Sequence, residues 1–170
     1  GAECEPRITC DDALMRAEPD SILLGAQIML RILEADACLI AVKEHSSACE
    51  HLQASIDKLN DDRFRLERVP DLYSAGGEAQ LLNLLQGIEV PHEGLPWDTG
   101  VICQNVATAA ALADFFSNAE PLISRIVTVS GRGVQQPVNV RARIGTPLSD
   151  LIECAGGYTD EAQRLIMGGP

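Results

Sequence analysis

Residues 38–69, CLIAVKEHSSACEHLQASIDKLNDDRFRLERV, decide the fold, because they contain two strand patterns separated by a helix pattern. The apolar run 38–43 predicts a buried strand, and 64–69 alternates well enough to predict a second one. Between them, apolar residues recur at helical spacing after a serine pair that can cap a helix. These apolar residues are Ala48, Leu52, Ile56 and Leu59. Strand, helix and strand in this order predict a parallel sheet with crossover helices, and hence an α/β fold.

The sequence on both sides of this unit adds helices that fit the same architecture. Apolar residues at helical spacing predict a helix before the first strand, with Asp20 or Ser21 as its N-cap. A further helix pattern, EAQLLNLLQG, ends at Gly87, a residue type that often follows the last helical residue. Residues 101–118 predict a short strand that leads into an alanine-rich helix capped by Asn105.

The sequence after residue 121 changes in character. SRIVTVSG and VNVRARIG alternate and stop at glycines, which predicts a β-hairpin. Thr146 as N-cap, followed by a proline at the first helical position, predicts a helix, and RLIM (164–167) predicts a last strand. We therefore expect two domains, 1–121 and 122–170, of which the second is a small β-grasp-like unit cut off at Pro170.

The composition argues against several classes of function. With 170 residues, of which 46% are hydrophobic, the chain is long enough to bury a core. Its net charge of −12 opposes binding to nucleic acid, or to anionic lipid by charge alone. No apolar run approaches the ~20 residues of a membrane span, and nothing resembles a signal peptide. The six cysteines form no C-x-x-C pair, which favours reduced thiols in the cytoplasm over a disulfide scaffold or a zinc site.

Three polar turns fall at predicted strand ends or helix starts: GAECEP (1–6), SAGGE (74–78) and CQNVAT (103–108). Taken alone, each has an ordinary explanation, namely a solvated acidic loop, a glycine turn and a helix N-cap. Two glycines before a helix also let a ligand approach the backbone at the helix N-terminus. Because strand-to-helix junctions line up along one edge of a parallel sheet, where ligands bind, we expect the three turns to meet at one crevice.

Other residue types give no sign of a catalytic or metal site. The three histidines have no clustered partner, and no serine lies in a nucleophile elbow. Trp97, the only tryptophan, lies in a loop that either covers the crevice or packs on the core. We therefore predict neither a catalytic side chain nor a metal ligand in this chain.

Five segments together resemble the RnfC family: GAECEPRITCDDALM, LYSAGGEAQLL, VPHEGLPWDTGVICQNVATA, VTVSGRGVQQPVNVRARIGTPLSDLI and IMGGP. RnfC proteins are the peripheral, cytoplasm-facing subunits of Rnf ion-translocating electron transport complexes. The same pattern is more distantly similar to the flavoprotein, NADH-oxidising subunit of respiratory complex I. The resemblance covers essentially the whole chain. It implies a Rossmann-like FMN- and NADH-binding parallel sheet with helices, followed by a truncated soluble-ligand-binding β-grasp (SLBB) domain.

The resemblance also implies contacts with the cofactors. Glu3 and Glu5 match the family's paired carboxylates, with Glu5 near the nicotinamide and Glu3 on the flavin side. Asn105 and Thr108 match the residues at a helix start that hold the ribityl phosphate of FMN. Carboxylates suit the carboxamide N–H₂ and ribose hydroxyls of NADH, and a helix N-terminus suits a phosphate.

The middle turn carries the remaining implied contacts. Tyr73, Gly76 and Gly77 match the turn that passes close to the isoalloxazine, and Glu78 lies beside the nucleotide. Position 77 is a glycine where the complex I relatives have a second acidic residue, so contacts with the nucleotide are expected to be weaker there.

The function implied is that of a core fragment that takes electrons from NADH through FMN toward iron–sulfur clusters. The family's flavin-cradling glycine-rich loop and lysine would lie upstream, and the cysteines for two four-iron, four-sulfur clusters downstream. We therefore expect the fragment alone neither to hold FMN tightly nor to oxidise NADH, although the parent would be an NADH-dependent translocase subunit. Its partners would be the other Rnf subunits, on the cytoplasmic face of the inner membrane.

Two other functions stay open. One is a docking module, in which the SLBB domain and the acidic surface hold the complex together and the Rossmann-like part is a scaffold without cofactor. The other is a flavoprotein similar to cobalamin reductases, which shares the acidic turn. Restoring the upstream segment discriminates electron transfer from docking, since a yellow protein with NADH-dependent dye reduction favours electron transfer.

Overall fold

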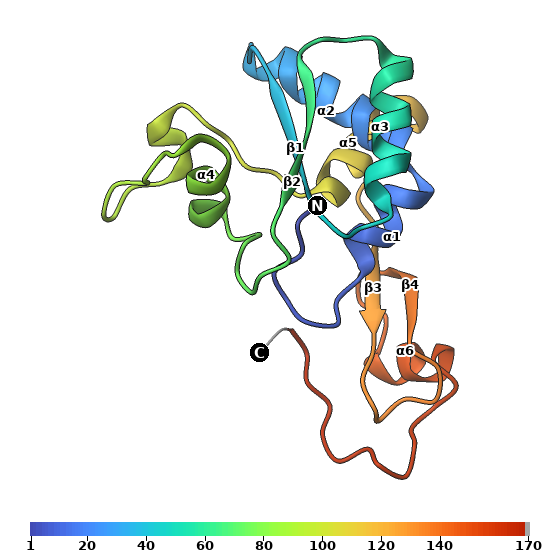
Figure 1. The fold of residues 1–170 in the computed structure, drawn as a ribbon. Helices are drawn as coiled ribbons and strands as arrows, with labels where there is room; N and C mark the ends of the chain where they lie inside the picture. The colour runs from blue at the N-terminus through green and yellow to red at the C-terminus, as the bar shows by residue number, and fades with distance from the viewer. Residues whose placement is uncertain (169–170) are drawn as a thin grey trace.

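The computed structural model describes residues 1–168 and contains the predicted strand–helix–strand unit (Figure 1). Strands β1 (Cys38–Lys43) and β2 (Phe64–Val69) pair in parallel, with Cys38 opposite Phe64 and Lys43 opposite Val69. Helix α3 (Ala48–Leu59) connects them. Both strands have the predicted bounds, and the prediction of an α/β fold with a parallel sheet is confirmed.

Further helices surround this strand pair. Helices α1 (Cys10–Ala17) and α2 (Pro19–Leu33) precede β1, α4 (Glu78–Gln86) follows β2, and α5 (Val106–Asn118) comes after the short 3-10 helix η1 (Pro96–Thr99). In the view of Figure 1, α3 and α4 lie on opposite sides of the strands. Among residues 1–168, every helix is too short or too polar to traverse a lipid bilayer.

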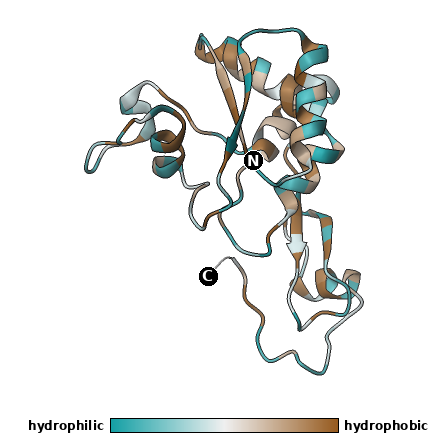
Figure 2. Ribbon diagram, in the orientation of Figure 1, coloured by the Kyte–Doolittle hydropathy of each residue, from teal (hydrophilic) through white to brown (hydrophobic). Residues whose placement is uncertain are grey.

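The main core lies between β1 and the helices α1, α2, α3 and α5. Val42 and Leu52 are completely buried there, and Figure 2 shows the hydrophobic residues of β1 and of the helices beside it. Helices α2 and α5 come close together at Gly25, where a β-carbon would lie 1.8 Å from the carbonyl oxygen of Ala109. Glycine at this position therefore allows two helix backbones to touch, and the apolar surface buried around it stabilises the fold.

The second part of the chain has its own small core. Strands β3 (Ser124–Val129) and β4 (Val138–Arg143) form the predicted antiparallel hairpin, and α6 (Leu148–Cys154) packs beside it. A hydrogen bond joins β3 to α5 of the first part, because Nη1 of Arg125 donates to the carbonyl oxygen of Ala107 over 2.7 Å. The domain boundary near residue 121 stays a prediction, and its predicted end at Pro170 lies outside the described residues.

Two predicted strands are wrong. We expected a short strand before α5 and a last strand at 164–167. The structure has no regular secondary structure at 101–105 or at 164–167. Apolar side chains mark both segments as possible strands, but a strand also needs a neighbour that pairs with its backbone groups. Within residues 1–168, neither segment has such a neighbour.

Helix starts also differ from prediction. Helix α2 begins at Pro19 with Glu18 in the N-cap position, so Asp20 already lies in the first turn. Proline suits this place because its fixed φ fits a helix and its missing N–H would have no partner there. Helix α6 has Pro147 in the N-cap position, whereas the Thr146 hydroxyl donates to the carbonyl oxygen of Arg143 over 2.8 Å. Helix α1 was not predicted at all.

The cysteines give a test of this fold. All six are free, and burial raises the pKa of the Cys38 thiol to about 11. At pH 8 only about a thousandth of Cys38 is then thiolate, the reactive form. We expect N-ethylmaleimide to modify the exposed Cys154 at least ~10-fold faster than Cys38, as followed by peptide mass spectrometry. A Cys154→Ser variant should lose the fast site, and faster labelling of Cys38 would contradict its place in β1.

Candidate functional site

The first two polar turns touch through their backbones. Residues 1–7, called the acidic turn, pass directly beside residues 74–78, called the glycine turn. A β-carbon on Gly76 would lie 1.6 Å from the carbonyl oxygen of Ala2 and 3.2 Å from the Cys4 sulfur. Since no atom fits at 1.6 Å, only glycine permits this contact.

The start of α5 joins the same site through hydrogen bonds. Oε1 of Glu3 accepts the backbone N–H of Asp11 over 2.8 Å, and Oδ2 of Asp11 accepts Nδ2–H of Asn105 over 2.7 Å. Oδ1 of Asn105 accepts the N–H of Ala107 over 2.8 Å, which confirms the predicted N-cap of α5. The acidic turn is therefore bonded to the asparagine at the head of α5 through one residue of α1.

The glycine turn also lies near the segment before α5, because the charge of Glu78 acts on the thiol of Cys103. Burial raises the pKa of the Cys103 thiol, and the negative charge of Glu78 raises it further. Glu78 is the first residue of α4, and Gly77 precedes it in the N-cap position. All three turns thus gather at one place, which we call the rim.

The rim is acidic and partly buried. Glu3 is half-buried, and this burial raises the pKa of its carboxyl. The hydrogen bond from the Asp11 N–H lowers that pKa and so offsets part of the increase. The charge of Asp11 adds to the increase. Because the folded state favours protonated Glu3, its contribution to stability is present at low pH and is lost as pH rises through the raised pKa. An additional hydrogen-bond donor at this carboxylate would reverse that loss.

Glu5 has a carboxylate oxygen with no partner. In the described part of the chain, its Oε2 is buried and accepts no hydrogen bond. A buried, unsatisfied carboxylate oxygen is costly and calls for an explanation such as a ligand. The acidic turn also holds Arg7, and the glycine turn Ser74, in the left-handed conformation, at φ of 67° and 64°. Non-glycine residues in this conformation carry backbone strain, which often accompanies binding sites.

The structure places the other predicted residues less decisively. Tyr73 is 63% exposed and borders a hollow of about 560 Å³ together with Leu84 and Val90. Thr108 lies half-buried in the first turn of α5, where its N–H donates to the carbonyl oxygen of Asn105 over 3.0 Å. Tyr73 directly precedes the glycine turn and Thr108 ends the third turn, and the contact of either residue with a cofactor stays a prediction.

Sequence reasoning missed the residue that joins the rim. Asp11 links Glu3 to Asn105, and its neighbour Cys10 contacts the Glu3 side chain. The run Thr9–Asp12 is a typical helix start, with a threonine followed by acidic residues, and this signal would have placed Asp11 near a helix N-terminus. Ligand atoms of Glu3, Cys10 and Asp11 lie within 4.8 Å of one another, but the two carboxylates already have the hydrogen-bond partners given above.

Two protein-family models match the chain. The Nuo51 FMN-binding domain matches residues 1–114, and the SLBB domain matches residues 126–170. The first match covers the strand pair and all three turns of the rim. The second covers most of the hairpin and all of α6.

Relatives of known name match along the whole chain. The chain is 42% identical over 170 residues to the C subunit of an ion-translocating oxidoreductase complex of Pseudomonas aeruginosa, and 40% identical to its counterpart in Rhodobacter capsulatus. It is 35% identical to the C subunit of a proton-translocating ferredoxin:NAD(+) oxidoreductase complex of Clostridium ljungdahlii. Each alignment covers 100% of this chain but only 22%, 33% and 37% of the three relatives, in that order. The resemblance to the RnfC family is confirmed.

A solved structure has the same fold. The chain superposes on an NAD+-reducing NiFe hydrogenase in the air-oxidised state with a TM-score of 0.71. The match covers 91% of this chain and 31% of that chain, at 23% sequence identity. Together with the two family models, this confirms the predicted fold class, a Rossmann-like α/β part followed by an SLBB domain.

Proposed function

Because the chain belongs to the Nuo51 FMN-binding domain family, we propose that its rim holds FMN and orients NADH against it. The proposal extends to the parent protein, which would be the C subunit of an ion-translocating electron transport complex. Support comes from the names of the relatives and from one structural observation, the buried Oε2 of Glu5 without a partner among the described residues.

The rim residues fit this pair of ligands by their chemistry. Ionised carboxylates only accept hydrogen bonds, and the amide N–H₂ and hydroxyl groups of NADH can donate them. Glu5 would use its free Oε2 for the nicotinamide amide, while Glu3 faces the flavin side. The carboxylate of Glu78 would accept a hydrogen bond from the nucleotide of NADH. The close approach of Gly76 to Ala2 leaves no room for a side chain at position 76.

The other half of the site would hold the flavin. Tyr73, Gly76 and Gly77 would border the isoalloxazine, and Asn105 and Thr108 would lie beside the ribityl phosphate. The acidic rim opposes an anion, so the phosphate depends on the positive end of α5, where the first N–H groups point out of the helix. Asn105 keeps one N–H of its side-chain amide for this purpose, because Asp11 takes the other.

FMN, when bound, would accept a hydride from NADH and release electrons one at a time. No side chain of the rim has to act as an acid or base for that transfer, so the chain's task is to bind, to orient and to exclude water. We propose that the electrons leave toward iron–sulfur clusters in another segment of the parent protein. The parent would then lie on the cytoplasmic face of the membrane, in contact with other subunits.

A glutamine at position 5 tests the proposal. In the complete subunit that contains this chain, Glu5→Gln is expected to raise the Kd for NADH about 10-fold, because a hydrogen bond to a charged group contributes about 1.5 kcal/mol. Glu50→Gln on the exposed start of α3 is the matched control and should change nothing. The readout is the rate of flavin bleaching against NADH concentration. Equal NADH dependence in both variants would exclude a role for Glu5.

The 170-residue chain alone makes a separate check. We expect only weak quenching of FMN fluorescence at micromolar protein and no oxidation of NADH. Stoichiometric FMN binding would contradict that expectation. A complete subunit that is colourless, but still binds its partner subunits, would instead support the docking function.

A further inference from the structure

The first turn of α1 is capped by the acidic turn and not by its own N-cap residue. Thr9 occupies the N-cap position, but its side chain makes no capping hydrogen bond. The carboxylate of Glu3 accepts the N–H of Asp11 in its place, over 2.8 Å. The first N–H groups of a helix need such an acceptor, and a negative charge suits the helix N-terminus. The position of Glu3 therefore depends on where α1 begins.

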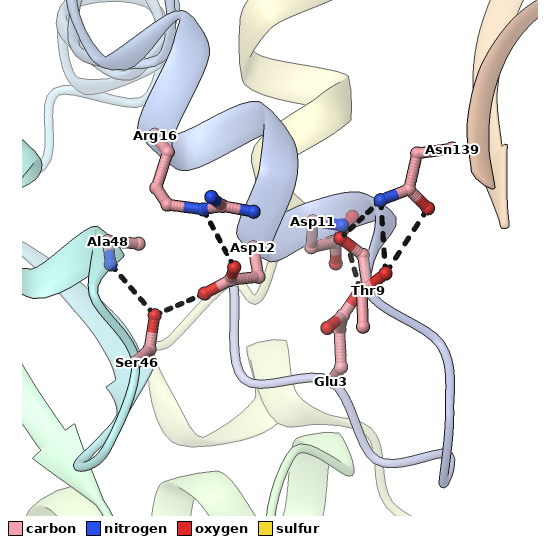
Figure 3. A network of polar contacts seen from close by, with 8 residues as sticks. All are labelled: Glu3, Thr9, Asp11, Asp12, Arg16, Ser46, Ala48 and Asn139. Atoms are coloured by element: carbon pink, nitrogen blue, oxygen red, sulfur yellow. Dashed lines mark hydrogen bonds and ion pairs between the residues drawn. The ribbon is translucent and has the colours of Figure 1, made fainter. Parts of the chain in front are cut away.

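The polar groups of Thr9 are bonded to the β3–β4 hairpin instead. Its N–H donates to Oγ1 of Thr128 over 3.1 Å. Nδ2 of Asn139 donates to Oγ1 of Thr9 over 3.0 Å and to the Thr9 carbonyl oxygen over 3.3 Å (Figure 3). Thr128 and Asn139 lie opposite each other in the hairpin, and the Thr128 hydroxyl donates to Oδ1 of Asn139 over 2.7 Å.

Cys10 lies near the same groups. The Cys10 sulfur lies within 4.8 Å of a carboxylate oxygen of Glu3, and burial raises the pKa of its thiol, which both Thr128 and Glu3 also affect. Glu3 is thus linked to the hairpin by the backbone at the start of α1, and the Cys10 thiol lies beside the same groups. Residues 1–4 have no regular secondary structure, so these contacts, together with the packing against Gly76, hold the acidic turn in place.

We propose that Thr128 and Asn139 are positioning residues that hold Glu3 at the rim through Thr9 and the start of α1. The second part of the chain then does more than follow the cofactor-binding part, because its hairpin fixes one wall of the site. What Glu3 contacts there rests on the function proposed above. The connection between the hairpin and Glu3 is independent of that function, because it consists of hydrogen bonds within this chain.

Amide hydrogen exchange of this chain, followed residue by residue by NMR, tests the link. Asn139→Ala is expected to speed exchange of the Asp11 N–H about 5- to 10-fold, the effect of losing a typical hydrogen bond. Thr128→Val should do the same, whereas Thr128→Ser keeps the hydroxyl and should exchange like the wild type. Arg141→Gln is the matched control, because it removes an ion pair from the same strand to Glu18, at the other end of α1.

The outcomes decide between the alternatives. Faster exchange at Asp11 in Asn139→Ala and Thr128→Val, with protected amides in β1 and α3 unchanged, supports the proposal. Unchanged exchange at Asp11 in both variants overturns it, and so does an equal increase in Arg141→Gln. If Asn139→Ala fails to fold, the Thr128→Val and Thr128→Ser pair decides.

A second measurement keeps this inference distinct from the proposed function. In the complete subunit, Asn139→Ala is expected to shift the midpoint potential of bound FMN, which a loss of stability alone would leave unchanged. A wild-type subunit without FMN would refute the proposed function, while the exchange of the Asp11 amide would still decide the positioning role. An FMN-binding subunit with an unaltered potential and unaltered Asp11 exchange in Asn139→Ala would refute the positioning role alone.

Discussion

Gly76→Ala is expected to separate the glycine turn from the acidic turn and to abolish FMN binding by the complete subunit. The new β-carbon would lie 1.6 Å from the carbonyl oxygen of Ala2 and 2.8 Å from its carbonyl carbon. Both are backbone atoms, so no rotation of a side chain relieves the clash. One of the two turns must move, at a cost of about 2–3 kcal/mol in the free energy of unfolding.

The neighbouring glycine provides the control for stability. A β-carbon on Gly77 would lie 2.5 Å from Oε1 of Gln80, which is the far end of a flexible side chain and can turn away. The φ of Gly77 is −66°, a value that alanine adopts without strain. Gly77→Ala is therefore expected to cost about 1 kcal/mol or less, mainly through a poorer N-cap of α4.

Urea unfolding of both variants of this chain measures the difference in stability, and quenching of FMN fluorescence by the complete subunit measures binding. Gly76→Ala should lose FMN binding, and Gly133→Ala, in the second part of the chain, is the control for binding, because Gly77 would itself border the flavin. If Gly76→Ala unfolds like Gly77→Ala and binds FMN like Gly133→Ala, the contact between the acidic and glycine turns does not shape the rim.

The parts of the fold that the sequence predicted depend on local patterns. Strands 38–43 and 64–69 were predicted with their observed bounds because an apolar run and an alternating run are both readable over six residues. Asn105 was predicted as an N-cap because its effect reaches only two residues along the chain. The errors at 101–105 and 164–167 have the opposite cause, since pairing depends on distant residues.

The same distinction applies to the candidate site. The sequence predicted that three turns would meet, on the premise that each follows a strand of one parallel sheet, but only the glycine turn comes after a strand, β2. It did not predict how they are joined, because Asp11 reaches Asn105 across 94 positions and Thr9 reaches Asn139 across 130. Side-chain hydrogen bonds between such distant positions leave no periodic pattern. The unsatisfied Oε2 of Glu5 could likewise be found only once burial was known.

Gly25→Ala tests the packing of α2 against α5, the helix that begins at the rim. Helix propensity alone predicts that this change in the middle of α2 stabilises the protein by about 1 kcal/mol. Its β-carbon would instead lie 1.8 Å from the carbonyl oxygen of Ala109 and 2.4 Å from its carbonyl carbon, in the backbone of α5. We expect the clash to dominate and to lower the free energy of unfolding by about 3 kcal/mol, at the upper end for overpacked cores.

Gly133→Ala is the matched control, because its β-carbon would approach only Ala162, at 3.2 Å from the nearest atom, and a shift of a few tenths of an ångström relieves it. Urea unfolding followed by circular dichroism compares the two. Since α5 carries Asn105 at its head, a displaced α5 should also weaken the bond between Asn105 and Asp11, and the Asp11 side chain should lose that restraint. A more stable Gly25→Ala protein would mean that the two helices do not touch at this point. The position of the start of α5 would then depend on other contacts.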